Sequence, residues 1–272
     1  MTPATPPGPG RPDDDVPAAE REALRRGAWR PWLPFLLTAA VCIGMLGWVT
    51  VALPDLPDRV PVHWGIDGRP DDWDEKSLGT VGMGPIVALG MTVLMALMAA
   101  IVPMMSPLPP DASPWRRVRQ AGVDRGMRTA LGWIAALTLL PMLPSTVEVL
   151  TAGAWRMPWW LMPLSLTLLM VGVMVALSAA IRGGTRWSDR VAQDLGHRPT
   201  AEEAAEEEKW TATGLKRDPD DPSAFPPKRE GYGVGATVNL ASRTGRLLTY
   251  GFVGVFIVGL PAAVWIAAAL NR

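Results

Sequence analysis

The sequence has little cysteine, little lysine and little charge. A single cysteine, Cys42, among 272 residues excludes an intrachain disulfide and a metal site built from several thiolates. Only four lysines accompany 22 arginines, which is typical of a GC-rich bacterial coding sequence. The 26 basic and 26 acidic side chains cancel, which disfavours a strongly basic nucleic-acid binder. We therefore expect no nucleic-acid partner.

Hydrophobic residues make up 49% of the chain and fall in five long runs that carry no charge. A helix needs about 20 residues to cross a hydrocarbon core of roughly 30 Å. Because the lipid interior offers no partner to backbone polar groups, apolar runs of this length must be helical. The runs cover residues 32–53, 81–105, 129–147, 157–181 and 247–271. We predict an all-α, polytopic integral membrane protein with five transmembrane helices, in contact with the lipid bilayer.

Prolines interrupt two of the runs. Pro141 and Pro144 in the third run and Pro261 in the fifth remove backbone donors, so we expect kinks there. The runs contain no Asp, Glu, Lys, Arg or His, which argues against a pump or a proton-coupled carrier.

Methionines in the second run allow a different function. Met91, Met95 and Met98 recur at helical spacing, and thioethers on one helical face can relay Cu(I). Methionine more often fills irregular gaps in packing. A copper or small-molecule carrier therefore stays as an alternative.

The basic residues are distributed unevenly between the two sets of loops. Of the 26, 21 lie in residues 1–31, 106–128 and 182–246, and five lie in residues 54–80, in 148–156 and after the last run. Cytoplasmic loops retain positive charge, so we place the N-terminus inside and the C-terminus outside the plasma membrane. The Pro- and Gly-rich stretch before the first run has too little apolar content to fold, and we expect residues 1–31 to form a disordered cytosolic tail.

The loop between the first two runs, residues 54–80, contains seven acids, one histidine and two tryptophans. Residues 60–64 have the β-branched and aromatic content of a strand, and Asp67-Gly68 is a turn signal. We expect a small strand–turn unit on the extracytoplasmic side.

The same loop resembles a known family. The positions that carry the resemblance are Leu56, Pro57, Pro61, Val62, His63, Gly68, Asp71, Trp73 and Lys76. They resemble the family catalogued as domain of unknown function 1648, in which this segment sits between the first two transmembrane helices. The resemblance implies a likeness to SdpI-type immunity proteins, which protect the membrane against a peptide toxin and hold a repressor at the membrane. It implies a recognition site for a peptide or lipid at Pro61, His63, Gly68, Asp71, Trp73 and Lys76.

Three roles for His63 compete. The imidazole can satisfy the turn and orient Lys76 and the acids. It can bind Zn²⁺ or a similar ion together with Asp67, Asp71, Asp72 or Asp74, although the spacing matches no known metal loop. General-base catalysis is disfavoured because the only hydroxyls in the loop are those of Ser77 and Thr80. We expect no resident metal, no cofactor and no catalytic residue, with a metal-dependent membrane hydrolase as the enzyme alternative.

The longest basic loop, residues 182–246, is expected to hold structure of its own. Trp187, Val191 and Leu195 follow a helical spacing, either in a juxtamembrane helix capped by Ser188 or in an extension of the fourth transmembrane helix. Thr200 and Glu203 form a capping box for an acidic run that we interpret as a solvated helix without a partner.

Residues 218–240 resemble a second family, catalogued as domain of unknown function 5808. The matching positions are Asp218-Pro219, Asp221-Pro222, Phe225, Pro227, Lys228, Arg229, Gly231, Gly233 and Asn239. The glycines predict a tight turn, because no Lys-Ser/Thr follows them as in a phosphate-binding loop. Lys228 and Arg229 either contact lipid phosphates or enforce the topology, and the second interpretation needs fewer assumptions.

The leading functional hypothesis is a non-enzymatic envelope sensor or peptide-toxin immunity factor. The outer loop would meet a peptide or lipid, and the arginine-rich inner face would meet a cytosolic protein partner.

Overall fold

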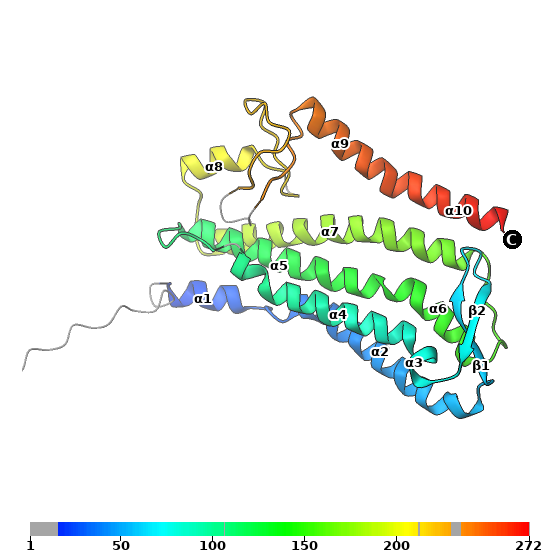
Figure 1. The fold of residues 1–272 in the computed structure, drawn as a ribbon. Helices are drawn as coiled ribbons and strands as arrows, with labels where there is room; N and C mark the ends of the chain where they lie inside the picture. Colours follow the sequence, from blue (N-terminus) through cyan, green and yellow to red (C-terminus); the bar gives the residue numbers. More distant parts are fainter. Residues whose placement is uncertain (1–15, 106, 212, 230–234, 272) are drawn as a thin grey trace, which may run out of the picture.

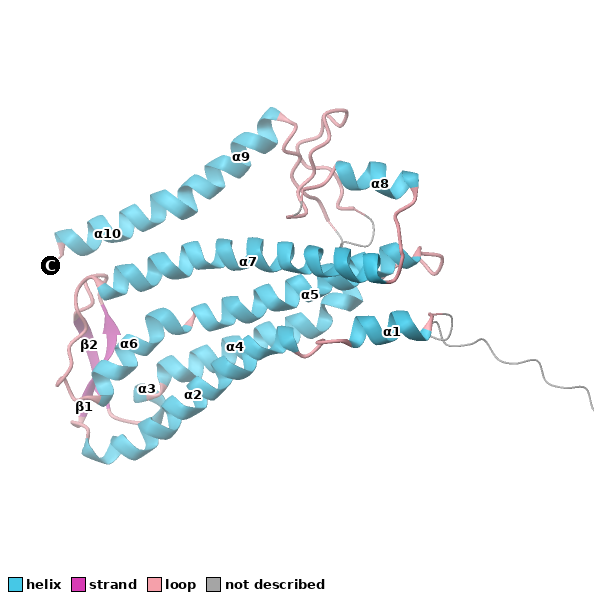
Figure 2. Ribbon diagram, turned by 180° about the vertical axis from the view of Figure 1, so that it is seen from behind, coloured by secondary structure: helices cyan, strands magenta, loops and turns pink. Residues whose placement is uncertain are grey.

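The computed structural model describes residues 16–105, 107–211, 213–229 and 235–271. The expected disorder of residues 1–15 lies outside this range. Most of the described chain is helical, and a single two-stranded sheet lies at one end of the long helices (Figures 1 and 2). The helices are α1 Ala18–Arg25, α2 Leu33–Ala52, α3 Leu78–Val81, α4 Met83–Ile101, α5 Pro114–Leu137, α6 Leu139–Leu150, α7 Leu161–Asp194, α8 Ala201–Glu208, α9 Arg243–Gly254 and α10 Leu260–Leu270. The strands are β1 Arg59–Trp64 and β2 Pro70–Glu75.

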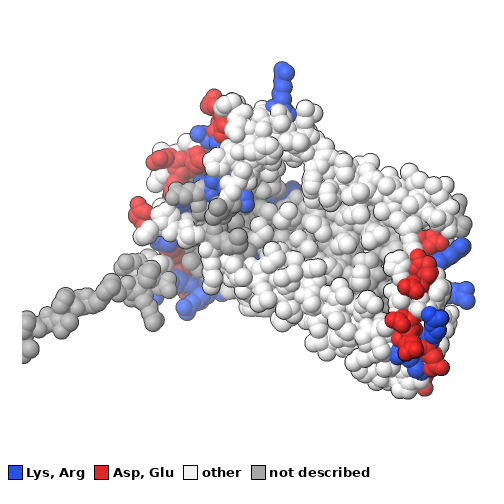
Figure 3. Space-filling model, viewed as in Figure 1, with Lys and Arg blue, Asp and Glu red and all other residues white. Residues whose placement is uncertain are grey.

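Five helical segments are long and apolar enough to cross a membrane, which confirms the predicted fold class. They are Ala18–Asp55, Met83–Ile101, Pro114–Leu150, Leu161–Asp194 and Arg243–Leu270. Figure 3 shows charged side chains gathered toward the two ends of the molecule, with a broad band between them that is nearly free of charge. Such a band is what a hydrocarbon core requires of the protein surface.

The two ends of the molecule differ in composition. The hairpin end contains β1, β2, residues 148–156 and the end of α10, whereas the basic end contains α1, the start of α5 and residues 182–211, 213–229 and 235–242 (Figures 1 and 2). The fold therefore brings the arginine-rich segments together at one end of the helices.

The third and fifth spanning segments are interrupted near Pro141 and Pro261, whereas Pro144, where a kink was also predicted, lies inside α6. The third consists of α5 and α6, which are separated at Thr138, three residues before Pro141. The fifth contains a π-helical turn, Val255–Gly259, directly before α10, which carries Pro261 near its start. In both cases the missing proline N–H leaves a carbonyl of the preceding turn without its helical partner.

The fourth span continues well past its predicted end at residue 181. Helix α7 runs without a break to Asp194, which confirms the extension. The alternative of a separate juxtamembrane helix is wrong, because Ser188 lies buried inside α7 and donates its hydroxyl to Thr185 O at 2.7 Å. Helix α5 likewise begins at Pro114, inside the segment predicted as the loop 106–128.

Helices α5 and α7 approach each other very closely. A Cβ atom added at Gly126 would lie 2.8 Å from Ala180 O, and one added at Gly122 would lie 2.6 Å from Gly184 O. Gly122 and Gly126 form a small-xxx-small pair against Ala180 and Gly184, as in tightly packed membrane helices. This pair was not predicted, because it lies among arginines outside the apolar run.

The predicted disorder of residues 1–31 is wrong for residues 18–25, which form α1. Glu20 is only 1% exposed and accepts two hydrogen bonds from Arg117, from Nε at 2.9 Å and from Nη2 at 3.0 Å. Leu24 packs against a cluster that contains Trp115 and Val118. A long-range ion pair and apolar contact therefore order a helix that composition alone does not predict.

Candidate functional site

The hairpin of β1 and β2 forms the predicted strand–turn unit. The strands pair antiparallel, with Arg59 opposite Glu75 and Pro61 opposite Trp73. Gly65 N donates to Arg69 O at 2.9 Å across the turn, and Gly68 has a φ of 75°, which suits glycine. The strand character of β2 was missed because aspartate and glutamate, which are rare in strands, fill it.

One face of the hairpin packs on the ends of the transmembrane helices. Val60 of β1 and Leu56 are buried against Val49 of α2, Val81 of α3 and Val149 of α6. Fully burying an aliphatic side chain of this size contributes roughly 1.5–3 kcal/mol. The apolar side chains of the loop are therefore used to fix it to the bundle.

A buried carboxylate also holds the hairpin. Glu148, at the end of α6, is 7% exposed and accepts a hydrogen bond from Trp64 Nε1 at 3.0 Å. The backbone N–H of Met157 lies 3.4 Å from the same oxygen. Glu148 thus joins β1 to α6 and to the loop that follows it. This contact could not be predicted from local sequence, since Trp64 and Glu148 are 84 residues apart.

Lys76 is turned toward the backbone at the end of the first span. Its ammonium donates to Leu56 O at 2.6 Å and to Pro54 O at 3.2 Å, and it lies 3.7 Å from Asp58. A cation at the C-terminal end of a helix satisfies carbonyls that have no helical partner. This geometry gives Lys76 a role in positioning the hairpin.

The opposite face of the hairpin carries the exposed polar groups. His63 Nδ1 lies 2.6 Å from Asp71 Oδ1, and the two side chains are 68% and 54% exposed. Trp73, which follows Asp71 by two residues, is 43% exposed. The pairing register shifts on both sides of His63. Such irregularities in a strand change the direction of a side chain, and here they accompany an accessible imidazole–carboxylate pair.

The structure does not gather the proposed metal ligands into one cluster. Asp67 is buried in the turn, where its carboxylate accepts from Arg69 N at 3.1 Å and lies 3.6 Å from the Arg69 guanidinium. Asp71 pairs with His63 instead. Within the described segments, no three His, Cys, Asp or Glu side chains lie close enough together to hold a metal ion.

A cavity of about 580 Å³ lies between the hairpin and the loop after α6. Arg59, Arg69 and Arg156 contribute to its lining, together with Glu148. Ala152 in the same wall has a φ of 48°, an uncommon conformation for a residue with a side chain. The guanidinium groups suit a ligand that carries a carboxylate or another oxyanion.

The six predicted recognition residues divide into three groups. Pro61, Gly68 and Trp73 line the cavity, whereas His63 and Asp71 form the exposed pair. The sixth, Lys76, holds the hairpin in place. The three arginines were not predicted, because only the folded hairpin brings them to one cavity.

Comparison with known families assigns this part of the chain. Residues 40–89 match the family model described as Domain of unknown function (DUF1648). The match covers 50 of the 272 residues. The matched region extends from the middle of α2, through the hairpin and α3, into α4. Comparison with curated proteins and with solved structures gave no match to the chain.

At the basic end, Asn239 organises the segment that follows α8. Its side chain is fully buried, and its Nδ2 donates to Asp218 O at 2.9 Å and to Asp221 O at 2.8 Å. Its Oδ1 accepts from Asp218 N and Ala241 N. Lys216 sits beside this motif, and its hydrogen bond to Asp221, assisted by Asp218, raises the pKa of its ammonium. The predicted motif residue Asn239 therefore has a clear structural function.

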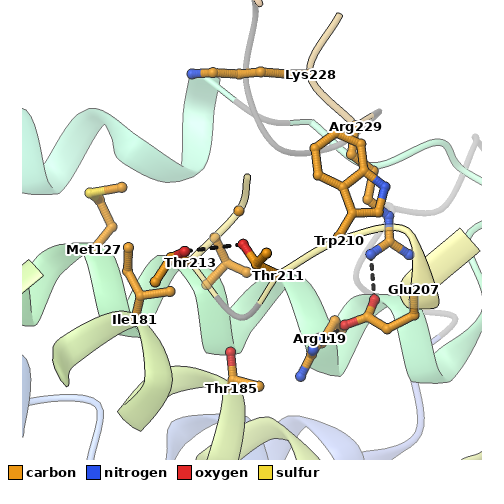
Figure 4. Close-up of a pocket in the computed structure, with 12 residues that line it drawn as sticks. Arg119, Met127, Ile181, Thr185, Glu207, Trp210, Thr211, Thr213, Lys228 and Arg229 are labelled. Atoms are coloured by element: carbon orange, nitrogen blue, oxygen red, sulfur yellow. Dashed lines mark hydrogen bonds and ion pairs between the residues drawn. The ribbon is translucent and has the colours of Figure 1, made fainter. Parts of the chain in front are cut away.

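The acidic helix α8 has no buried residue, as its interpretation as a solvated helix requires, but one side of it is bound to the bundle. Glu207 pairs with Arg119 of α5 and with Arg229, which lie on two sides of it (Figure 4). Burial alone would raise the pKa of Glu207, but the hydrogen bonds and charges of Arg229 and Arg119 outweigh it and lower that pKa. Glu203 forms the predicted capping box and also accepts a hydrogen bond from Ser113 at 2.7 Å.

The remaining predicted residues of this motif are dispersed. Lys228 and Arg229 line a cavity of about 180 Å³ with Trp210 and Arg119 (Figure 4). Pro227 pairs with Ala236, and Phe225 is 56% exposed. Gly231 and Gly233 lie outside the described residues. Because the Arg229 side chain is only 10% exposed and pairs with Glu207, enforcing the topology is not its only role.

Proposed function

We propose that the protein is a non-enzymatic envelope sensor or peptide-toxin immunity factor of the plasma membrane, with its N-terminus in the cytosol. The observation that carries the proposal is a hairpin that is fixed on one face and accessible on the other. Its apolar face is buried against three helices, while His63, Asp71 and Trp73 are exposed. Binding residues on a rigid support lose little conformational entropy when they contact a ligand.

The chemistry of the cavity favours a peptide that carries an acidic group. Arg156, in the loop after α6, lines the cavity and is exposed, and Arg59 and Arg69 line it from the hairpin. Trp73 supplies a large, half-exposed aromatic surface next to them. Arginine and tryptophan side chains are enriched among the residues that dominate binding energy at protein interfaces.

The basic end is proposed to contact a cytosolic protein. Most of the arginines lie at this end, which supports placing it inside the cell. Phe225 leaves an aromatic side chain 56% exposed on the segment after α8. A protein partner that covers Phe225 would connect this end to a cytosolic response.

The outer site can be tested with cells that produce Trp73→Ala, Arg156→Gln or His63→Ala variants at the wild-type level. Growth would be measured against a panel of envelope-active peptides. For at least one peptide, we expect Trp73→Ala to lower the inhibitory concentration about tenfold, the effect of losing one strong contact. Asp55→Asn is the control, since Asp55 is exposed in the same loop but does not line the cavity. Equal sensitivity of all variants, the wild type and a deletion strain would refute the proposal.

A further inference from the structure

An apolar groove of about 530 Å³ runs between α5 and α7. Its lining residues all come from these two helices. On α7, Gly172, Ala176, Ala179 and Gly183 recur every three or four residues, so they lie along one face. On α5, Trp133 and Leu137 form the other wall. The small side chains of α7 leave a channel beside the larger side chains of α5.

The groove lies in the apolar band of the molecule and is open to its surroundings. Trp133 is 51% exposed and Val175 is 60% exposed, although both belong to helices that are apolar enough to cross a membrane. From Gly172 to Gly183 the helix rises about 16 Å, since each residue adds about 1.5 Å. One leaflet contributes about half of a hydrocarbon core roughly 30 Å thick. The groove therefore has the length of one leaflet.

The end of the groove nearest the basic end carries a positive charge. Arg125 lines this end, and its guanidinium lies 4.9 Å from the ring centroid of Trp187. Arg30 is close by, because a Cβ atom added at Gly27 would lie 3.2 Å from Arg125 Nη2 and 3.3 Å from Arg30 Cδ. Across the described part of the chain, neither Arg125 nor Arg30 forms an ion pair with a carboxylate. Two neighbouring guanidinium groups without a counter-charge attract an anion.

We propose that this groove binds one anionic phospholipid, with its phosphate at Arg125 and Arg30 and an acyl chain along the small residues of α7. Guanidinium groups bind phosphate through paired N–H donors. Basic pockets between transmembrane helices on the cytoplasmic side bind anionic headgroups by the same chemistry. A lipid fits better than a soluble anion because the charged end continues into an apolar channel. This site is independent of the ligand proposed for the hairpin.

Lipid retention by the full-length protein tests the proposal. The purified protein would be exchanged into mixed micelles that contain phosphatidylglycerol or phosphatidylcholine with identical acyl chains, and bound lipids would be counted by native mass spectrometry. We expect the wild type to retain one phosphatidylglycerol with at least about a fivefold preference, the effect of one basic residue near a charged headgroup. Equal retention of the two lipids by the wild type would overturn the proposal.

Two charge variants separate a specific contact from a general attraction. Arg125→Gln should reduce the preference to near one, while Arg125→Lys should keep most of it. Arg182→Gln is the matched control, because Arg182 bonds to Ser178 O of its own helix at 3.1 Å and does not line the groove. A preference that survives in Arg125→Gln, or that falls equally in Arg182→Gln, would overturn the assignment of the phosphate to Arg125.

A third variant tests the acyl channel. Ala179→Trp fills the groove and should reduce retention of both lipids, whereas Leu97→Trp places the same side chain at a position that is 57% exposed on α4 and should change nothing. Thermal unfolding in lipid-free detergent would identify any variant that fails to fold, in which case Ala176→Leu fills the same channel with a smaller group. Retention at the wild-type level in a folded, groove-filled variant would overturn the proposal.

Discussion

The hairpin end and the basic end are held to the helices by different forces. At the hairpin end, Val60 and Leu56 are buried against helix ends, and Trp64 donates to the buried Glu148. At the basic end, ion pairs link segments distant in sequence, such as Arg117 with Glu20 and Arg229 with Glu207. Apolar burial depends little on salt and pH, whereas ion pairs near a surface depend on both. The hairpin is therefore suited to constant display, and the basic end is suited to release and reattachment.

The largest loss of stability is expected from a substitution where α5 and α7 are in backbone contact. Gly184→Leu would place a side chain against the backbone of Gly122 and Gly126, so α5 and α7 would have to separate. We expect loss of a monodisperse protein in size-exclusion chromatography, since the strain exceeds the 1–3 kcal/mol that is typical of overpacking. Gly183→Leu is the control because nothing lies within 4 Å of a Cβ atom added there. Equal behaviour of the two variants would contradict the close packing of α5 and α7.

The next largest effect is expected at the ion pair that holds α1. Glu20→Gln leaves Arg117 without its charged partner and should destabilise the docked α1 by about 3 kcal/mol, as breaking a buried pair does. Hydrogen exchange of residues 18–25 should become much faster. Glu22→Gln removes an exposed pair with Arg26 and should change exchange very little. If both variants behave alike, the basic end does not depend on its buried ion pair.

A smaller loss of stability is expected when the hairpin loses the hydrogen bond from Trp64 to Glu148 of the bundle. Trp64→Phe keeps most of the ring but removes the donor to Glu148, which should cost about 1–3 kcal/mol. Because the apolar contacts of Val60 remain, the hairpin should stay attached, and its amide hydrogens should exchange only somewhat faster. Trp73→Phe is the matched control on the exposed face. Detachment of the hairpin in Trp64→Phe would show that this end also depends on a polar contact.

The smallest effect is expected from titration of Glu207. The pKa of this carboxyl is lowered in the folded protein, so its contribution is present at neutral pH. That contribution is lost as the pH falls below the ordinary value for glutamate and through the lowered one. We expect hydrogen exchange of residues 201–229 to accelerate on acidification while the hairpin changes less. Glu207→Gln should show the accelerated exchange already at neutral pH and remove this pH dependence.

Features that depend on local sequence could be predicted, and features that depend on distant partners could not. The five spans follow from the length of the uncharged runs, and β1 and its turn follow from residues 60–68. The small-xxx-small contact at Gly122 was hidden because charged residues surround it. The order of α1 depends on Arg117, which lies 97 residues from Glu20.

The candidate site shows the same limit. His63, Asp71 and Trp73 could be predicted as recognition residues from the sequence of the loop, and all three are exposed in the structure. Arg156 and Glu148 could not be selected, because nothing near them in sequence indicates that they face the hairpin. Lys76 was predicted to be a recognition residue. In the structure it donates hydrogen bonds to two backbone carbonyls instead, which the sequence does not indicate.

The length of α7 has a mechanical consequence. Its 34 residues extend over about 51 Å, which exceeds a hydrocarbon core of roughly 30 Å by about 20 Å. The projecting part carries Asp189, which bonds to Arg119, and is joined to α8 by residues 195–200. A rigid rod that pivots within the bilayer moves its free end sideways. Any change in the tilt of α7 would therefore act as a lever on the segment that follows it.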